Sequence, residues 1–192
     1  MAPLQNAGTF LIQTLFDLYL FVLLLRFILQ YLRVDYYNPL TQFVVKATNP
    51  LVVPLRRFIP GYWGLDLATV VLIVAFTFLK IILVSILGAH RFPALIGLLL
   101  WALGDITRLT LNLFFYATLL KVILSWIAPL SQSPVNAVIY RLTEPMMSRA
   151  RRFIPPIAGF DVSPVLILIG LQLVMMLLAD PLTQKGLYLA IR

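Results

Sequence analysis

Long apolar runs separated by shorter mixed segments dominate the pattern along this chain. Four runs are long enough to cross the hydrocarbon core of a bilayer, which takes roughly 20 helical residues. These candidate spans are Phe10–Leu32, Leu67–Gly88, Ile106–Ile127 and Val162–Asp180. Leucine, isoleucine, valine and phenylalanine fill them, and proline is absent beyond the first turn of each. The pattern predicts an all-α membrane protein with four transmembrane helices.

A fifth apolar stretch, Pro93–Leu103, is too short to span a membrane. At the rise of an α-helix it reaches about 16 Å, half a bilayer. We expect a short interfacial helix there, separated from the third span by a bend at Gly104. The scattered glycines, Gly88, Gly97 and Gly104 among them, predict no close helix–helix seam.

The segments between paired spans also repeat apolar residues at helical spacing. These residues are Leu40, Phe43, Val44 and Ala47 in the first segment and Val135, Val138, Ile139 and Leu142 in the second. Each segment predicts an amphipathic helix that ends before Pro50 or Pro145, because a residue preceding proline disfavours the helical region. Two arrangements are open for the rest of each segment. It is either a partly re-entrant loop surrounded by protein or a hairpin lying on the membrane surface.

The second half of the chain repeats the first. A shift of 95 residues, from Arg56 to Arg151, aligns the two halves without a gap between Arg26 and Asp66. The run Arg56-Arg57-Phe58-Ile59-Pro60 recurs as Arg151-Arg152-Phe153-Ile154-Pro155, and Asp66 falls on Asp161. We therefore divide the chain into two repeats, 1–95 and 96–192, each a span, a basic loop and a second span. Because two spans separate equivalent points, the repeats should run parallel.

Composition and charge strengthen this interpretation. Hydrophobic residues make up 61% of the chain and charged residues 11%, against about 45–50% and about 25% in soluble domains. The cations behind the net charge of +8 gather in the two loops. The positive-inside rule then predicts cytoplasmic loops and both termini outside. Because membrane topology accounts for the positive charge, nucleic acid is not an expected partner.

Several kinds of chemistry are excluded or unsupported. The chain has no cysteine and one histidine, His90, which excludes disulfides, thiolate metal sites and covalent haem. The sequence offers no nucleophile–base set, metal-ligand cluster or phosphate-binding glycine loop. We expect no cofactor, no metal and no enzymatic activity. The amino terminus lacks the basic region of a signal peptide, so the first run should remain as an anchor.

Charged residues inside the spans suggest specific contacts. Asp17 and Lys80 both lie about 11–12 Å below the outer boundary by helical rise. We predict an ion pair between them that serves either helix registration or ion coupling. Asp105 and Arg108 are three residues apart on one helix, and we expect them to pair with each other.

Other charges lie at the loop side. Arg26 and Lys121 occupy equivalent positions near the ends of their spans, from which we expect them to snorkel to the interface. Asp66 and Asp161 precede the second and fourth spans as helix N-caps, and both can also pair with the loop arginines. The candidate docking residues are Arg56, Arg57, Phe58, Pro60, Arg151, Arg152, Phe153 and Pro155. Their arginines serve topology and lipid headgroups, or they dock an anionic partner, since guanidinium groups grip phosphate and carboxylate bidentately.

The first loop resembles a known family signature. The matching segments are Asn38-Pro39-Leu40, Thr48-Asn49-Pro50-Leu51, Arg56-Arg57-Phe58-Ile59-Pro60 and Asp66, which resemble the YggT family, also called YlmG. The second copy departs from the pattern with Glu144 for asparagine, Met146 for leucine and Arg149 for the second proline. The resemblance implies a two-repeat protein of the bacterial inner membrane without established catalytic activity. It also implies an association with osmotic or potassium tolerance, cell division and complex assembly.

Two functional hypotheses follow. The leading one is a non-enzymatic inner-membrane scaffold or assembly factor whose two basic loops dock a membrane partner or anionic lipid. The alternative is a small oligomeric channel or transporter linked to osmotic or potassium homeostasis. The expected partners are the bilayer, its anionic headgroups, and another membrane protein or a second copy of this chain.

Overall fold

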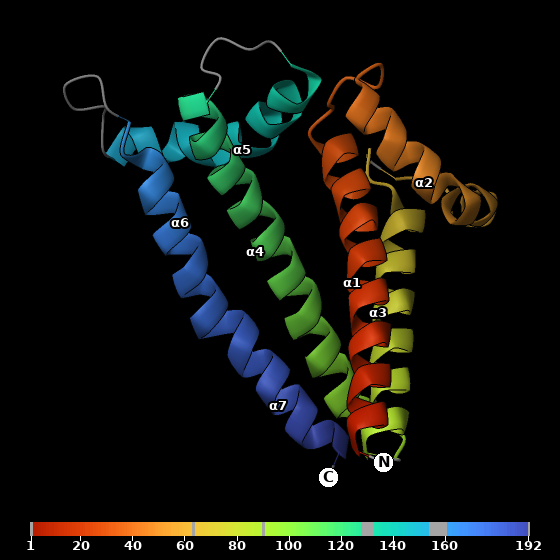
Figure 1. Cartoon of the computed structure of the whole chain (residues 1–192). Coiled ribbons are helices and arrows are strands. Elements are labelled where there is room, and N and C mark those ends of the chain that lie inside the picture. Colours follow the sequence, from red (N-terminus) through yellow and green to blue (C-terminus); the bar gives the residue numbers. More distant parts are fainter. Residues whose placement is uncertain (1, 63, 90, 128–132, 154–160, 192) are drawn as a thin grey trace.

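A computed structural model describes residues 2–62, 64–89, 91–127, 133–153 and 161–191 (Figure 1). The regular secondary structure of these residues is helical, apart from one isolated β-bridge between Tyr62 and Leu65. Four helical rods are long and apolar enough to cross a membrane. They are α1 (Ala2–Tyr31), α3 (Leu67–Ala89), α4 (Leu95–Ile127) and a rod built from α6 (Ser163–Val174), η1 (Met175–Ala179) and α7 (Asp180–Ile191). The all-α class and the four spans are confirmed.

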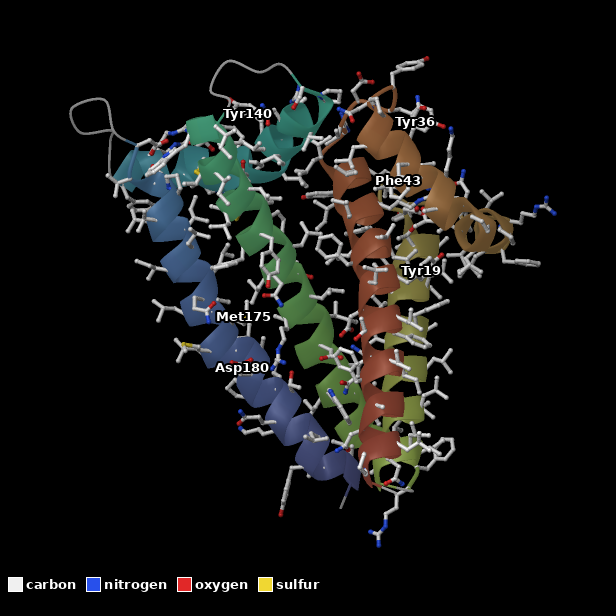
Figure 2. The ribbon with its side chains drawn as sticks, in the orientation of Figure 1. Tyr19, Tyr36, Phe43, Tyr140, Met175 and Asp180 are labelled. Carbon is white, nitrogen blue, oxygen red and sulfur yellow. The ribbon has the colours of Figure 1, made fainter. Side chains whose placement is uncertain are left out.

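The two repeats run parallel, as predicted. Helix α1 packs along α3, and α4 packs along α7. The two pairs converge near both chain termini and diverge toward the other end of the molecule (Figure 1). Helices α2 (Pro39–Arg56) and α5 (Pro134–Phe153) both lie at that other end, which we call the basic end. The tyrosine and phenylalanine side chains of Tyr36, Phe43 and Tyr140 also lie there (Figure 2).

Helix α2 begins as its sequence predicts but ends later. The side chain of Asn38 accepts a hydrogen bond from the Leu40 N–H at 2.9 Å, and Pro39 follows in the first turn. Its buried residues, Thr41, Val44, Thr48 and Val52, form one face along the helix. The predicted end before Pro50 is wrong, because the helix continues through that proline to Arg56. Helix α5 likewise passes through Pro145 to Phe153. Packing of the buried face against the spans outweighs the lost N–H.

The basic end joins the two repeats through one core. Val44 and Val52 of α2 belong to the same buried cluster as Val138 of α5 and the leucines of α1. The side-chain amide of Asn38 donates to the Pro134 carbonyl oxygen at 2.8 Å. Asn38 therefore caps α2 and also contacts the start of α5. The segments between paired spans therefore form the partly buried helices α2 and α5, rather than irregular loops.

The third span is longer than predicted. Residues from Leu95 onward belong to α4, so the expected separate helix over Pro93–Leu103 with a bend at Gly104 is wrong. A Cβ atom added at Gly97 or Gly104 would collide with α7, and one at Gly186 would collide with α4. Because glycine has no Cβ atom, the backbones of α4 and α7 approach each other closely, as in membrane-helix interfaces built from small residues. The prediction of no glycine seam is wrong for the same reason.

The fourth span does not end at Asp180. Pro181 follows it, and a proline inside a helix lacks an N–H and clashes with the carbonyl four residues earlier. The π-helical turn Met175–Ala179 relieves this conflict, with the Asp180 N–H bonded to the Met175 carbonyl. Beyond this turn α7 continues to Ile191.

Candidate functional site

The inner arginine of the first basic motif is bound within the protein. Arg56 ends α2 and grips Asp66 with two nitrogens, Nε to Oδ1 at 3.2 Å and Nη2 to Oδ2 at 2.6 Å. Its Nη2 also donates to Gln30 Oε1 at 3.0 Å, which ties the end of α2 to the end of α1. The ion pair closes the segment between α2 and α3 and holds it against the start of α3.

Asp66 is buried and caps α3, as predicted. Its carboxylate accepts from the Thr69 hydroxyl at 2.5 Å and from the Thr69 N–H at 3.4 Å. Burial by itself raises the pKa of Asp66, but hydrogen bonds from Arg56 and Thr69 and the charge of Arg56 outweigh it, so the pKa is lowered. The carboxylate therefore stays ionised beneath the arginine.

Arg26 lies under α2 and does not snorkel. Its side chain is 4% exposed. Its Nη1 donates to Thr48 Oγ1 at 2.6 Å, to Asn49 Oδ1 at 2.9 Å and to the Val45 carbonyl at 3.3 Å. Its Nε lies 3.8 Å from Asp66 Oδ2, the oxygen that Arg56 also contacts. The snorkelling prediction is wrong because α2 covers this position and supplies acceptors.

The second repeat builds an equivalent cluster with different charges. Lys121 occupies the position of Arg26, and its Nζ lies 3.4 Å from Glu144 Oε2 and 4.9 Å from the Tyr140 ring centroid. Arg151 occupies the position of Arg56, and its Nη1 lies 3.0 Å from Glu144 Oε1. Its Nε also pairs with Asp161 at 2.9 Å. Glu144 therefore bridges the two cations, whereas the corresponding residue in the first repeat is neutral.

The prediction that Asp161 is the N-cap of the fourth span is wrong, because Asp161 precedes the N-cap by one residue. The N-cap of α6 is Val162, which makes no side-chain cap bond. Asp161 Oδ1 instead accepts from the Ser163 N–H at 2.9 Å. Partial burial raises the pKa of Asp161, but hydrogen bonds from Ser163 and Arg151 outweigh this and lower it. The carboxylate supports the helix start without being its N-cap.

The outer residues of both motifs extend from the protein. Arg57 and Arg152 are exposed and make no ion pair with other described residues. The next residues are exposed phenylalanines, Phe58 at 82% and Phe153 at 86%. Pro60 is also exposed, whereas Pro155 lies outside the described residues. We call the two Arg-Phe pairs 57–58 and 152–153 the basic tips.

A second polar group lies inside the membrane-spanning region. The predicted pair is present, with Lys80 Nζ 2.6 Å from Asp17 Oδ1. The same nitrogen lies 2.5 Å from Asp105 Oδ2 on α4. Lys80 is 7% exposed, whereas the Asp17 side chain is 50% exposed. The intramembrane cluster of these three residues links α1 and α3 of the first repeat to α4 of the second, and it borders a cavity of about 360 Å³.

The predicted pairing of Asp105 with Arg108 is wrong. Asp105 faces Lys80, and Arg108 Nη2 lies 2.7 Å from Asp180 Oδ1 on the fourth span. Asp180 directly follows the π turn of that span (Figure 2). Contacts between spans outcompete the local pair because α4 has charged neighbours on two sides. Within the described residues, no group of three carboxylate or imidazole side chains is arranged to hold a metal ion.

Comparison with known proteins matches the repeat architecture. The CCB3/YggT family model matches residues 5–87 and again residues 100–182. The chain belongs to this family. The two CCB3/YggT units start 95 residues apart, which is the shift that aligns the two basic motifs. The earlier resemblance to YggT proteins is confirmed.

Relatives of similar length match nearly the whole chain. The chain is 42% identical to an uncharacterized protein of Pseudomonas aeruginosa over 183 residues, which cover 95% of this chain and 93% of the relative. It is 42% identical over 179 residues to a Vibrio alginolyticus protein described by its position in the proC 3′ region, covering 92% and 95%. It is 35% identical to the uncharacterized protein YggT of Escherichia coli K12 over 183 residues, covering 95% and 94%. No solved structure matches the chain.

Sequence reasoning missed several members of these clusters in this CCB3/YggT protein. It did not assign a partner to Arg26, and it did not connect Lys121 with Glu144. A signal existed in the repeat alignment, where residues 26 and 49 of the first unit fall on residues 121 and 144 of the second. A cation and a hydrogen-bond acceptor recur there at the same separation. Asp105 had no comparable signal, because its partner lies in the other repeat.

Proposed function

We propose that this CCB3/YggT protein is a non-enzymatic scaffold or assembly factor of the bacterial inner membrane. Its basic end faces the cytoplasm, and the two basic tips dock an acidic segment of another membrane protein. The observation that carries the proposal is that the two arginines of each motif have different environments. Arg56 and Arg151 are bound to carboxylates of the chain, whereas Arg57 and Arg152 are exposed next to exposed phenylalanines.

This division of roles supports docking. The inner ion pairs fix the position of each tip, so little conformational freedom is lost when a partner binds. Arginine and aromatic residues, phenylalanine among them, are enriched at protein–protein interfaces. The tips follow the ends of α2 and α5 at the basic end, on opposite flanks of the molecule, so each tip is a separate docking point (Figure 1). The competing explanation is that the phenylalanines insert into the lipid interface and the arginines contact headgroups.

Photocrosslinking distinguishes these explanations. A benzophenone-bearing phenylalanine analogue replaces Phe58 or Phe153, each a conservative change at an exposed ring. The docking proposal expects a discrete protein adduct in cells from both positions, and its loss when Arg57→Glu and Arg152→Glu are added. The same analogue at Tyr188, exposed at the opposite end, should give no such adduct. Adducts to lipid alone, or protein adducts unchanged by the charge reversals, would refute the proposal.

The sidedness is testable because the chain contains no cysteine. Single substitutions Arg57→Cys and Tyr188→Cys supply one thiol each at opposite ends. The positive-inside rule predicts that a membrane-impermeant maleimide added to intact spheroplasts labels only the Tyr188→Cys variant. Labelling of the Arg57→Cys variant instead would reverse the orientation.

The intramembrane cluster favours a second candidate function, a small channel or transporter. Charged groups within spans often mark ion pathways, and Asp17, Lys80 and Asp105 border a cavity of about 360 Å³. This alternative expects potassium or proton flux in proteoliposomes that changes with Asp17→Asn. The scaffold proposal expects no flux above that of empty liposomes.

A further inference from the structure

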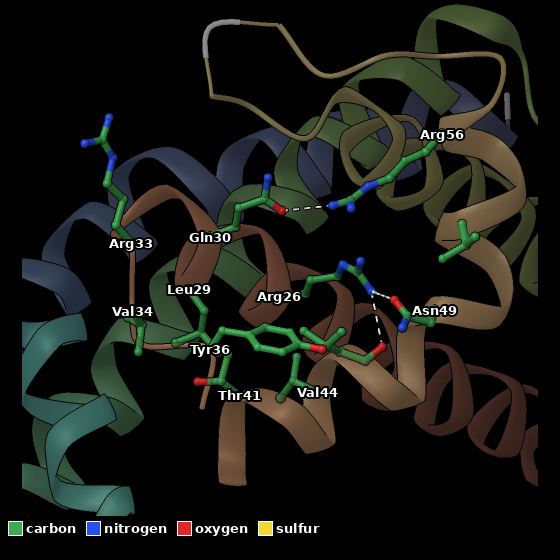
Figure 3. Close-up of a pocket in the computed structure, with 12 residues that line it drawn as sticks. Arg26, Leu29, Gln30, Arg33, Val34, Tyr36, Thr41, Val44, Asn49 and Arg56 are labelled. Carbon is green, nitrogen blue, oxygen red and sulfur yellow. Dashed lines mark hydrogen bonds between the residues drawn. The ribbon is translucent and has the colours of Figure 1, made fainter. Parts of the chain in front are cut away.

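A cavity of about 480 Å³ lies between the end of α1 and the inner side of α2. Three cationic side chains, Arg26, Arg33 and Arg56, line it, and its lining includes no carboxylate. Figure 3 shows Arg56 pointing toward Gln30 and Arg26 toward Asn49, whereas Arg33 points away from both; Arg26 and Arg56 also share a contact with Asp66. We call this cavity the arginine pocket. Its charge suits an anion.

Two buried polar atoms in the pocket lack a hydrogen-bond partner among the described residues. They are Arg26 Nε and Thr41 Oγ1, on residues that are 4% and 5% exposed. Buried donors of this kind are rare, because leaving one unsatisfied costs about 1–3 kcal/mol. Both side chains line the cavity. Arg26 Nε lies 3.8 Å from Asp66 Oδ2, so of these two atoms the Thr41 hydroxyl is the one with neither a hydrogen bond nor an ion pair among the described residues.

The second repeat shows where the anion would lie. There Glu144 bridges Lys121 and Arg151, at 3.4 Å and 3.0 Å. The corresponding cations of the first repeat, Arg26 and Arg56, face the neutral Asn49 and Gln30 instead. Two cations share one carboxylate, Asp66, in the first repeat, whereas the second repeat has two carboxylates for two cations. One negative charge is missing from the first cluster.

The backbone of Arg33 adds an independent observation. Arg33 adopts φ of 52°, a left-handed conformation that favours glycine. The Val34 N–H bonds to the Leu29 carbonyl, and the Arg33 N–H bonds to the Gln30 carbonyl. These two bonds form the Schellman motif that ends many helices, usually with glycine at this position. The residue at this strained position is a cation at the pocket rim, so it adds positive charge near the cavity, although its side chain points away from Arg26 and Arg56 (Figure 3).

We propose that the arginine pocket binds a phosphate-class oxyanion, which bridges Arg26 and Arg56 as the Glu144 carboxylate bridges their counterparts. The ligand is the phosphate of a phospholipid headgroup or a soluble phosphate. The pocket includes neither Arg57 nor Phe58, so the proposal goes beyond partner docking and stands or falls separately from it.

The test uses purified full-length protein and counts bound ligand by native mass spectrometry. One arm adds phosphatidylglycerol, with phosphatidylcholine as the headgroup control. The other arm adds inorganic phosphate and measures binding with radiolabelled phosphate by equilibrium dialysis. Saturable binding of one phosphatidylglycerol identifies a lipid site, and saturable binding of phosphate alone identifies a soluble ligand. No preference for phosphatidylglycerol over phosphatidylcholine, together with no phosphate binding, would overturn the proposal.

Three substitutions locate the site. Asn49→Glu supplies the missing carboxylate from within the chain, so we expect at least a tenfold loss of affinity. The isosteric change Gln30→Glu places a carboxylate beside Arg56 at an exposed position, where it does not threaten folding, and should give the same loss. Asn49→Gln is the neutral control and should retain binding.

The reciprocal change is made in the second repeat. Glu144→Gln removes the bridging carboxylate there, so a second equivalent of the anion should bind. Thermal unfolding of each variant shows that it is folded before its binding is measured. Wild-type affinity in both the Asn49→Glu and Gln30→Glu variants would overturn the assignment, even if the purified protein bound phosphatidylglycerol elsewhere.

Discussion

Replacing Lys80 by methionine should expose the energetic role of the intramembrane cluster. The ammonium group lies 2.6 Å from Asp17 and 2.5 Å from Asp105. Methionine keeps much of the apolar length of the side chain and adapts to irregular packing. The substitution therefore removes the charge but little volume, and it leaves two carboxylates without their cation.

The expected loss follows from burial. Removing one partner of a buried ion pair costs roughly 3–5 kcal/mol, because the remaining charge stays desolvated. Lys80 is 7% exposed, but the Asp17 side chain is 50% exposed and relaxes more easily. We therefore expect the lower part of this range, about 3–4 kcal/mol. For a chain of this size that corresponds to a melting temperature lower by about 6–16 °C.

Thermal unfolding of the purified protein in detergent measures this shift. The triple variant Lys80→Met/Asp17→Asn/Asp105→Asn removes all three charges together and should recover most of the lost stability. Leu79→Met, at an exposed position of the same helix, controls for the introduction of methionine. A Lys80→Met variant that melts within about 2 °C of the wild type contradicts the burial argument. If the triple variant is no more stable than Lys80→Met, the stability lost in Lys80→Met comes from packing rather than from unpaired charge.

Three further predictions concern the fold. Gly97→Ala should destabilise the protein by about 1–3 kcal/mol, because its Cβ meets the α7 backbone. Its matched control is Gly170→Ala, where nothing lies within 4 Å of the added atom, so thermal unfolding should show unchanged stability or a gain of about 1 kcal/mol. Asn38→Ala should cost about 1–2 kcal/mol in the same assay, because it removes a helix cap and a bond between the repeats. Because the folded-state pKa of Asp66 is lowered, its stabilisation should be present above about pH 4 and disappear as the pH falls through the folded value, and Asp66→Asn should flatten that dependence.

The architecture was largely predictable because it depends on length, apolarity and repetition. A span needs about 20 apolar residues, and the shift from Arg56 to Arg151 implies parallel repeats whatever the details of packing. The extents of the third and fourth spans were not predictable in this way. Whether Gly104 bends a helix or admits a neighbouring backbone depends on what lies opposite, here Thr183 of α7. Similarly, Pro181 ends a helix unless the turn before it widens.

The parts of the candidate site that depend only on depth in the membrane were predictable. Depth in the membrane follows from helical rise alone, and it brought Asp17 and Lys80 together. Depth does not show which face of a helix meets which neighbour, so Asp105 was assigned to Arg108 instead of Lys80. The burial of Arg26 was missed because snorkelling assumes open interface above the side chain, and α2 occupies that space.

The difference between Asn49 and Glu144 separates the roles of the two repeats. Both repeats place a cation of their first span against α2 or α5, with Arg26 buried and Lys121 partly buried, and both bind the inner arginine to an aspartate. An arrangement needed only for folding would be served equally well by a glutamate in both places, since it neutralises the cluster from within. The first repeat instead has the neutral Asn49 there, at a cavity that is also lined by Arg33, whose backbone is in the left-handed region. The basic tips are therefore a two-fold feature of the molecule, whereas the arginine pocket is a single one, and a docked partner should leave the binding stoichiometry of the oxyanion at one per chain.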